Sequence, residues 1–160
     1  MYKILFLIFI SLFFVSCSSK NNAFKYFEKD EVETKGVQYT KKTDILINGN
    51  EVDVIFWATY LNKIDKKISD TNEELFLVSV YFTNKESQDI FENNYSFLLN
   101  GIEPTSLEKV EKDNENFKSL MLKNNWGKYY LVKFASQDVY TLTIQLKDKG
   151  SNSALLNFEK

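Results

Sequence analysis

The side chains that carry out most catalysis and bind most metals are scarce in this chain of 160 residues. It has no His and a single Cys, and all twenty of its basic residues are Lys. Zinc, haem and iron–sulfur sites, and the Cys/His and Ser/His/Asp catalytic sets, cannot be assembled from these residues. The absence of Arg also removes the bidentate group best suited to phosphate and guanine. The composition therefore predicts no bound cofactor and argues against an enzyme with such a centre.

Carboxylates remain as candidates for catalysis or metal binding. Glycosidase-type chemistry requires two carboxyl groups about 5–10 Å apart in a cleft, but Glu51 and Asp53 alternate outward along a predicted strand, where solvation explains them. Residues 113–116 offer the oxygen ligands that calcium prefers. Their spacing matches no known calcium loop and lacks the turn glycine, so a hydrated loop is favoured. We expect a non-enzymatic protein without a metal site.

The first residues have the layout of a signal peptide. Lys3 precedes an apolar run, residues 4–15, which is followed by small residues. Twelve helical residues span about 18 Å, well short of the ~30 Å hydrocarbon core of a bilayer. A cation, a short apolar stretch and small residues are typical of a secretory signal. Residues 1–16 are therefore predicted to be removed on export.

The only thiol lies at the end of this segment. The sequence Phe14-Val15-Ser16-Cys17 resembles the lipobox of bacterial lipoproteins, although Phe14 stands where Leu is usual. The resemblance implies cleavage before Cys17, a diacylglycerol on its sulfur and an acylated amino group. The alternative is a plain signal peptide with a chance Cys. Ser18 is not the Asp of an inner-membrane retention signal, which favours the outer membrane over the inner one.

After the anchor, a tether over residues 17–35 is expected to lead to one domain, residues 36–160. Within the tether, residues 23–27 are expected to dock on the domain or on lipid headgroups.

Apolar residues in the domain alternate with period two, which predicts short strands. Asn48-Gly49 is a strong hairpin signal, because both turn positions require positive φ. About seven such strands without crossover helices predict an all-β antiparallel β-sandwich, immunoglobulin-like in outline, with a small β-barrel as the alternative.

Residues 105–125 fit this pattern least well. Leu107, Val110, Phe117, Leu120 and Met121 have helical spacing. The polar residues 112–116 form a poor helix interior, however. We therefore predict a short element, a polar loop and a strand over residues 119–122, and leave the helical stripe as the alternative.

Four short strings stand out along the domain: Asn48-Gly49, Ala58-Thr59-Tyr60-Leu61-Asn62, Leu99-Asn100-Gly101 and residues 125–132. They look like landmarks of small uncharacterised lipoproteins of Campylobacter and its relatives, at least one of which has a variant immunoglobulin fold. The resemblance covers most of the mature chain. It implies an exported, lipid-anchored β-sandwich and brings no functional residues with it.

Aromatic and aliphatic residues that fall off the predicted core face are the best lead to a partner. They are Ile55, Trp57, Tyr81, Trp126 and Tyr129. Exposed together, they would form a patch of the kind that binds a protein or a surface glycan. The alternative is that this sheet face is covered, either by the segment with Phe24, Tyr26 and Phe27 or by residues 105–125.

These observations predict a lipid-anchored, non-enzymatic binding or adhesion module of the cell envelope. The alternative function is a periplasmic carrier of a small ligand or lipid, which would require a continuous apolar cavity inside the domain. Nucleic acid is not an expected partner, because acidic residues outnumber Lys by 22 to 20 and phosphate binding relies on clustered excess cations.

Overall fold

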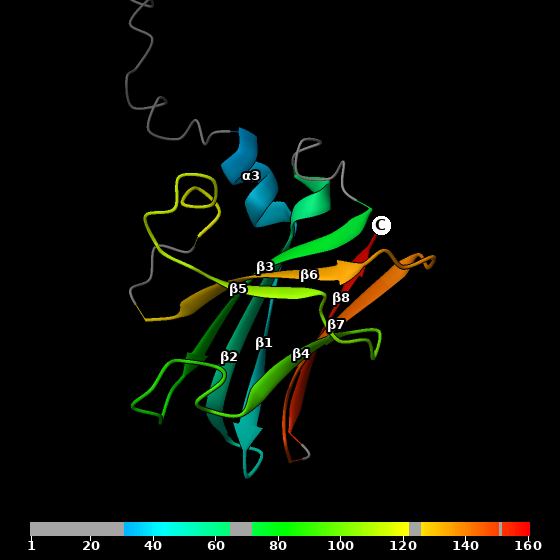
Figure 1. The fold of residues 1–160 in the computed structure, drawn as a ribbon. Helices are drawn as coiled ribbons and strands as arrows, with labels where there is room; N and C mark the ends of the chain where they lie inside the picture. Colours follow the sequence, from blue (N-terminus) through cyan, green and yellow to red (C-terminus); the bar gives the residue numbers. More distant parts are fainter. Residues whose placement is uncertain (1–30, 65–71, 122–125, 151) are drawn as a thin grey trace, which may run out of the picture. The chain divides into compact units, whose positions relative to one another are not determined.

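The computed structural model describes residues 31–64, 72–121, 126–150 and 152–160. The chain there forms one helix, one 3-10 turn and eight strands (Figure 1). The elements are α3 (Glu31–Gln38), β1 (Thr40–Ile47), β2 (Glu51–Tyr60), η2 (Leu61–Lys63), β3 (Glu73–Phe82), β4 (Tyr95–Leu99), β5 (Ser106–Val110), β6 (Lys128–Ala135), β7 (Thr141–Asp148) and β8 (Ser153–Glu159).

The strands form two antiparallel sheets. The larger sheet has the order β1-β2-β3-β6-β5, and the smaller has the order β4-β7-β8. Within the described residues no ladder joins the sheets, so the alternative of a closed barrel is not formed. The predicted all-β antiparallel sandwich is confirmed, with eight strands. Its likeness to an immunoglobulin domain lies in the two packed sheets, which here contain five and three strands.

Turn chemistry fixes the strand register as expected. Asn48 and Gly49 have φ values of 51° and 77°, and they join β1 to β2. Asn100 and Gly101 have φ values of 49° and 84° directly after β4. Two successive positive φ angles define the turn that matches the twist of an antiparallel hairpin.

The ladder between β1 and β2 contains a bulge. Ile45 lies opposite Val54 and Leu46 opposite Val52, which leaves Asp53 as the extra residue.

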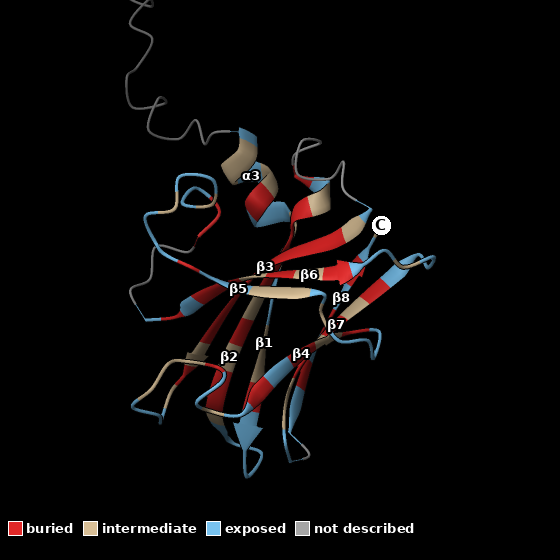
Figure 2. Ribbon diagram, viewed as in Figure 1, coloured by how far each residue is buried: buried red, intermediate tan, exposed pale blue. Residues whose placement is uncertain are grey.

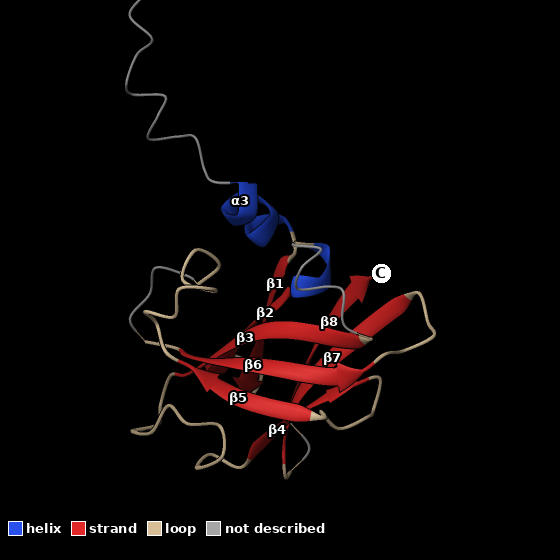
Figure 3. Cartoon of the chain, turned by 45° about the horizontal axis from the view of Figure 1, so that its top comes forward, coloured by secondary structure: helices blue, strands red, loops and turns tan. Residues whose placement is uncertain are grey.

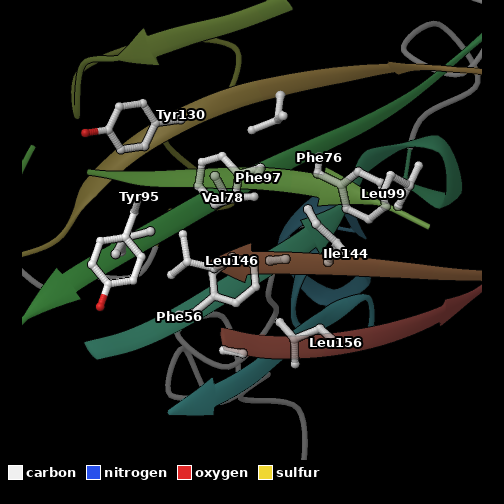
Figure 4. Close-up of a cluster of buried hydrophobic side chains, with 14 of the residues drawn as sticks. Phe56, Phe76, Val78, Tyr95, Phe97, Leu99, Tyr130, Ile144, Leu146 and Leu156 are labelled. Carbon is white, nitrogen blue, oxygen red and sulfur yellow. The ribbon is translucent and has the colours of Figure 1, made fainter. Parts of the chain in front are cut away.

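The core between the sheets is filled by large side chains, which β2, β3 and β6 supply on one side and β4, β7 and β8 on the other (Figure 4). Phe56 of β2 contacts Phe97 of β4, with ring centroids 5.9 Å apart. Phe76 of β3 lies edge-on to Phe158 of β8 at 5.4 Å. Figure 2 shows buried residues on strands of both sheets, alternating in most of them with less buried ones. Rings from both sheets therefore meet in the middle of the sandwich.

A second, smaller cluster lies on the opposite face of the five-stranded sheet. It contains Leu61, Ile64, Leu75, Leu77, Val110, Leu120, Met121 and Tyr129, with Val32, Tyr39, Phe117 and Leu131 packed against them. Helix α3 and the turns after β5 supply part of this cover. Gly36 permits close contact, since a Cβ there would lie 2.6 Å from Leu120 Cδ2. Figure 3 shows α3 and η2 at the same end of the sandwich as the end of β8.

The structure revises the prediction for residues 105–125. β5 forms an edge strand beside β6, but the strand predicted over residues 119–122 is wrong for its described part, because residues 115–120 form turns and residue 121 a bend. The backbone N–H groups of Lys118 and Met121 donate to the carbonyls of Asn114 and Phe117. These turns place Phe117, Leu120 and Met121 on one side, against the second cluster. The helical spacing thus reflects a real apolar face, although no helix forms there.

The predicted tether ends at residue 35. In the structure, α3 begins at Glu31 and continues across this position to Gln38. Val32 packs against the second cluster. Part of the segment assigned to the tether therefore contributes to the folded body.

Truncation of Phe56 should strongly destabilise the domain. Its side chain is fully buried, and Phe→Ala changes in a packed core cost about 3–5 kcal/mol through lost burial and the cavity left behind. Phe91→Ala is the matched control, since Phe91 is 61% exposed and should lose less than about 1 kcal/mol. Urea unfolding measures both. Equal losses for the two variants would contradict the core described above.

Candidate functional site

An apolar hollow lies on the outer face of the five-stranded sheet, beyond the edge of the second cluster. Ile55 and Trp57 come from β2, Tyr81 comes from β3, and Trp126 and Gly127 precede β6. Ile55 lies directly opposite Tyr81 in the ladder. These five residues enclose a volume of about 180 Å³ whose lining is almost entirely apolar. The structure therefore brings together four of the five residues predicted to form a partner patch.

Two aromatic rings of the hollow contact each other, and one of them, that of Trp126, is exposed. The rings of Tyr81 and Trp126 are tilted by 40° with centroids 6.0 Å apart. Trp126 is 68% exposed, so its ring forms a wall of the hollow that faces solvent. Across the hollow, Lys42 Nζ lies 5.8 Å from the centre of the Trp57 ring and 3.2 Å from the Asp44 carboxylate. The hollow thus has an aromatic wall on one side and an ion pair on the other.

Tyr129 does not belong to this surface. It is only 3% exposed and lies in the second cluster. Its partners in the sheet are Ser79 of β3 and Val110 of β5, and the turns that follow β5 contribute Leu120 and Met121 to the same cluster. For Tyr129, therefore, the expectation of an exposed side chain is wrong, and the alternative of cover by residues 105–125 holds.

A second hollow adjoins the first through Gly127. It encloses about 400 Å³ and is lined by Lys109, Val110, Glu111, Lys112, Asp113, Gly127, Lys128 and Tyr129. Lys109 Nζ lies 3.1 Å from the Glu111 carboxylate. This polar hollow forms where β5 and β6 diverge beyond their last pair, Val110 with Tyr129. Lys109 lies in β5, Lys112 just after it and Lys128 at the start of β6, and only the pairing of the two strands places these lysines together.

A buried carboxylate, Glu74, is the other notable group. It is 3% exposed, and it lines a shallow polar pocket of about 300 Å³ with Tyr60, Ser136 and Lys160. The Tyr60 hydroxyl donates to Glu74 Oε2 at 2.6 Å. Lys160 Nζ lies 2.5 Å from Oε1, which also accepts from the Gln137 backbone N–H at 3.3 Å.

These contacts determine the charge of the carboxyl group. Burial alone would raise the pKa of Glu74, but hydrogen bonds from Lys160, Tyr60 and the Gln137 N–H, with the Lys160 charge, lower it below its ordinary value of 4.5. Burial raises the pKa of Tyr60, and the neighbouring Glu74 raises it further. Both carboxylate oxygens accept from donors, so this network joins β2, β3 and the residue that follows β8.

The described residues contain no group of three or more His, Cys, Asp or Glu side chains that could hold a metal ion. No helix in that part of the chain is long and apolar enough to cross a bilayer. Cys17, the predicted signal peptide and the segment with Phe24, Tyr26 and Phe27 lie outside the described residues.

Comparison with known proteins identifies no family model, no curated protein and no solved structure that matches this chain. The candidate site therefore rests on its own geometry.

Replacing Glu74 by Gln should remove a pH-dependent part of the stability. Because folding lowers the pKa of Glu74, the ionised network stabilises the domain above pH 4.5, and this contribution is lost as the pH falls through the folded pKa. At pH 7, Glu74→Gln should cost about 1–3 kcal/mol, as expected for hydrogen bonds to a buried charge. The difference from wild type should shrink on acidification, measured by urea unfolding from pH 7 to pH 3.

The control for this prediction is Glu108→Gln. Glu108 is exposed and lies 3.7 Å from Lys133, and exposed pairs contribute about 0–1 kcal/mol. A Glu74→Gln deficit that stays constant across the pH range would contradict the role given to the Glu74 charge.

Proposed function

We propose that this protein is a lipid-anchored, non-enzymatic binding module of the cell envelope, which contacts another macromolecule through the aromatic hollow. The observation that carries the proposal is the grouping of Ile55, Trp57, Tyr81 and the exposed Trp126 around one apolar hollow. Trp and Tyr contribute much of the energy at binding surfaces, because their rings bury a large area at a small entropy cost. Covering these rings with a partner removes apolar area from water, which favours binding.

The filled interior supports a surface binder over a carrier. Phe56, Phe97 and Tyr130 form a chain of ring contacts between the sheets, with centroids 5.9 and 6.4 Å apart. A carrier would use this space for its ligand. The accessible apolar volume described above lies instead on the outer face of the sheet.

The lipobox supports attachment to a membrane at Cys17, with the outer membrane favoured by Ser18. Each buried CH₂ contributes about 0.8 kcal/mol, so two or three acyl chains on one residue hold a protein far more firmly than one myristoyl chain. An anchored module of this kind would present its hollow to partners in the envelope or on a neighbouring surface.

The anchor is tested by metabolic labelling with a palmitate analogue in a bacterium that matures lipoproteins. Wild type should be labelled, and Cys17→Ala should lose the label, because the thiol is the proposed acceptor. Ser19→Ala, a control close by in the sequence, should keep it. Equal labelling of wild type and Cys17→Ala would overturn the proposed anchor.

The binding role is tested by site-directed photo-cross-linking in the native envelope. A benzophenone amino acid replaces Glu111, which lines the polar hollow, and, as a control, Leu155, which is exposed on the smaller sheet. The Glu111 position should give a discrete adduct that Trp126→Ala reduces at least about fivefold, as expected for loss of an interface aromatic. Recovery of only bulk lipid and abundant porins, or the same adducts from both positions, would contradict the proposal.

A further inference from the structure

We infer that the aromatic hollow and the adjoining polar hollow together bind an acidic polysaccharide, with one sugar ring stacked among Trp57, Tyr81 and Trp126. This inference rests on the proposed function and names the partner class. The two hollows share Gly127, so a single extended chain can lie across both. The inference depends on their combined size, lining and charge.

The aromatic hollow has the size and lining for one ring of a polymer. Its volume of about 180 Å³ lies below the ~300–1,000 Å³ of sites that enclose a drug-sized ligand. A pyranose ring presents a face of C–H groups that packs against an aromatic ring. The tilted pair of Tyr81 and Trp126 and the Trp57 ring supply such surfaces, while the open side of the hollow lets the polymer continue.

The polar hollow suits the hydroxyl groups that such a ring carries. Lys109 and Lys128 supply donors, and Glu111 and Asp113 supply acceptors. Each sugar hydroxyl both donates and accepts a hydrogen bond, so a polyhydroxylated ligand can use the two kinds of group together. A purely apolar partner would leave these charged side chains desolvated without partners, at a cost in binding free energy.

Charge around the hollows favours an anionic polymer. Lys42, Lys109, Lys112 and Lys128 surround them, against the three carboxylates of Asp44, Glu111 and Asp113. Asp44 and Glu111 already pair with Lys42 and Lys109, and Lys128 has no ion pair with a carboxylate within the part of the chain that is described. The chain as a whole carries more acid than base, 22 to 20. The surroundings of the two hollows thus carry one more Lys than carboxylate, whereas the whole chain carries more acid than Lys. This local excess of positive charge favours carboxylated sugars.

A protein partner is less well supported by the same residues. Stable protein interfaces bury about 800 Å² on each side and centre on an apolar core with few charges. Here the apolar centre consists of four side chains, with charged groups on either side of it. A protein that binds this surface is therefore the alternative outcome of the test.

The test uses the full lipidated chain in detergent, titrated with oligosaccharides of polygalacturonate, alginate and hyaluronan, and with neutral dextran. Calorimetry gives the affinity, and fluorescence gives the location, because Trp57 and Trp126 are the only tryptophans in the chain and both line the hollow. At least one acidic oligosaccharide should bind, change the tryptophan emission and bind at least tenfold more tightly than dextran.

Variants then assign the contacts. Trp126→Ala should weaken binding at least tenfold, and Lys128→Gln should weaken it about two- to fivefold and reduce its salt dependence. Tyr140→Ala is the matched control, because Tyr140 is another exposed aromatic outside both hollows, and it should bind as wild type does. No binding by any of the three acidic probes, equal binding of dextran, or an unchanged affinity in Trp126→Ala would overturn the inference.

The two failures are distinguishable. If the acidic probes fail while the Glu111 position still yields a discrete protein adduct that depends on Trp126, the polysaccharide inference falls and the binding role stands. If the probes fail and that adduct is also missing, both fall.

Discussion

The larger sheet has two apolar faces, and each must be covered. Nearly every residue of β3 is buried on one face or the other, so this central strand cannot turn either side to water without losing burial energy. The smaller sheet packs against the inner face. On the outer face, α3 and the turns after β5 cover the part with Leu77 and Tyr129. The aromatic hollow is a part of this face that stays accessible.

A buried carboxylate on β3, Glu74, links the larger sheet to the end of the smaller one. Glu74 receives hydrogen bonds from Tyr60 on β2 and is paired with Lys160 beyond β8. Removing one partner of such a buried ion pair leaves the other charge desolvated and unpaired. The pair therefore favours the correct arrangement of the strands as much as it adds net stability. The network therefore fixes where β8 ends relative to the larger sheet, while Lys41 Nζ, 2.6 Å from the Asn157 carbonyl, adds a link between β1 and β8.

The sequence predicted local features well and the pairing between distant elements poorly. Period-two alternation and Asn-Gly turns identified strands and the sandwich, because both are properties of neighbouring residues. Alternation alone does not say which face of β6 will be covered, so Tyr129 was expected to be exposed. It also does not pair residue 110 with residue 129, and the polar hollow depends on that pair. The Glu74 network was missed for the same reason, since Tyr60 and Lys160 lie 14 and 86 positions from Glu74 in the chain.

The hollow and the core depend on one register. In β2, Ile55 and Trp57 alternate with the core residues Val54 and Phe56, and Tyr81 of β3 lies between Val80 and Phe82. A slip of one residue would exchange the two sets, placing the hollow's residues in the core and the core's residues on the surface. Selection for a packed core therefore also keeps the rings of the hollow in position. β2 and β3, which carry Ile55, Trp57 and Tyr81, are hydrogen-bonded to a neighbouring strand on both sides. This preorganisation would lower the entropy cost of the proposed binding.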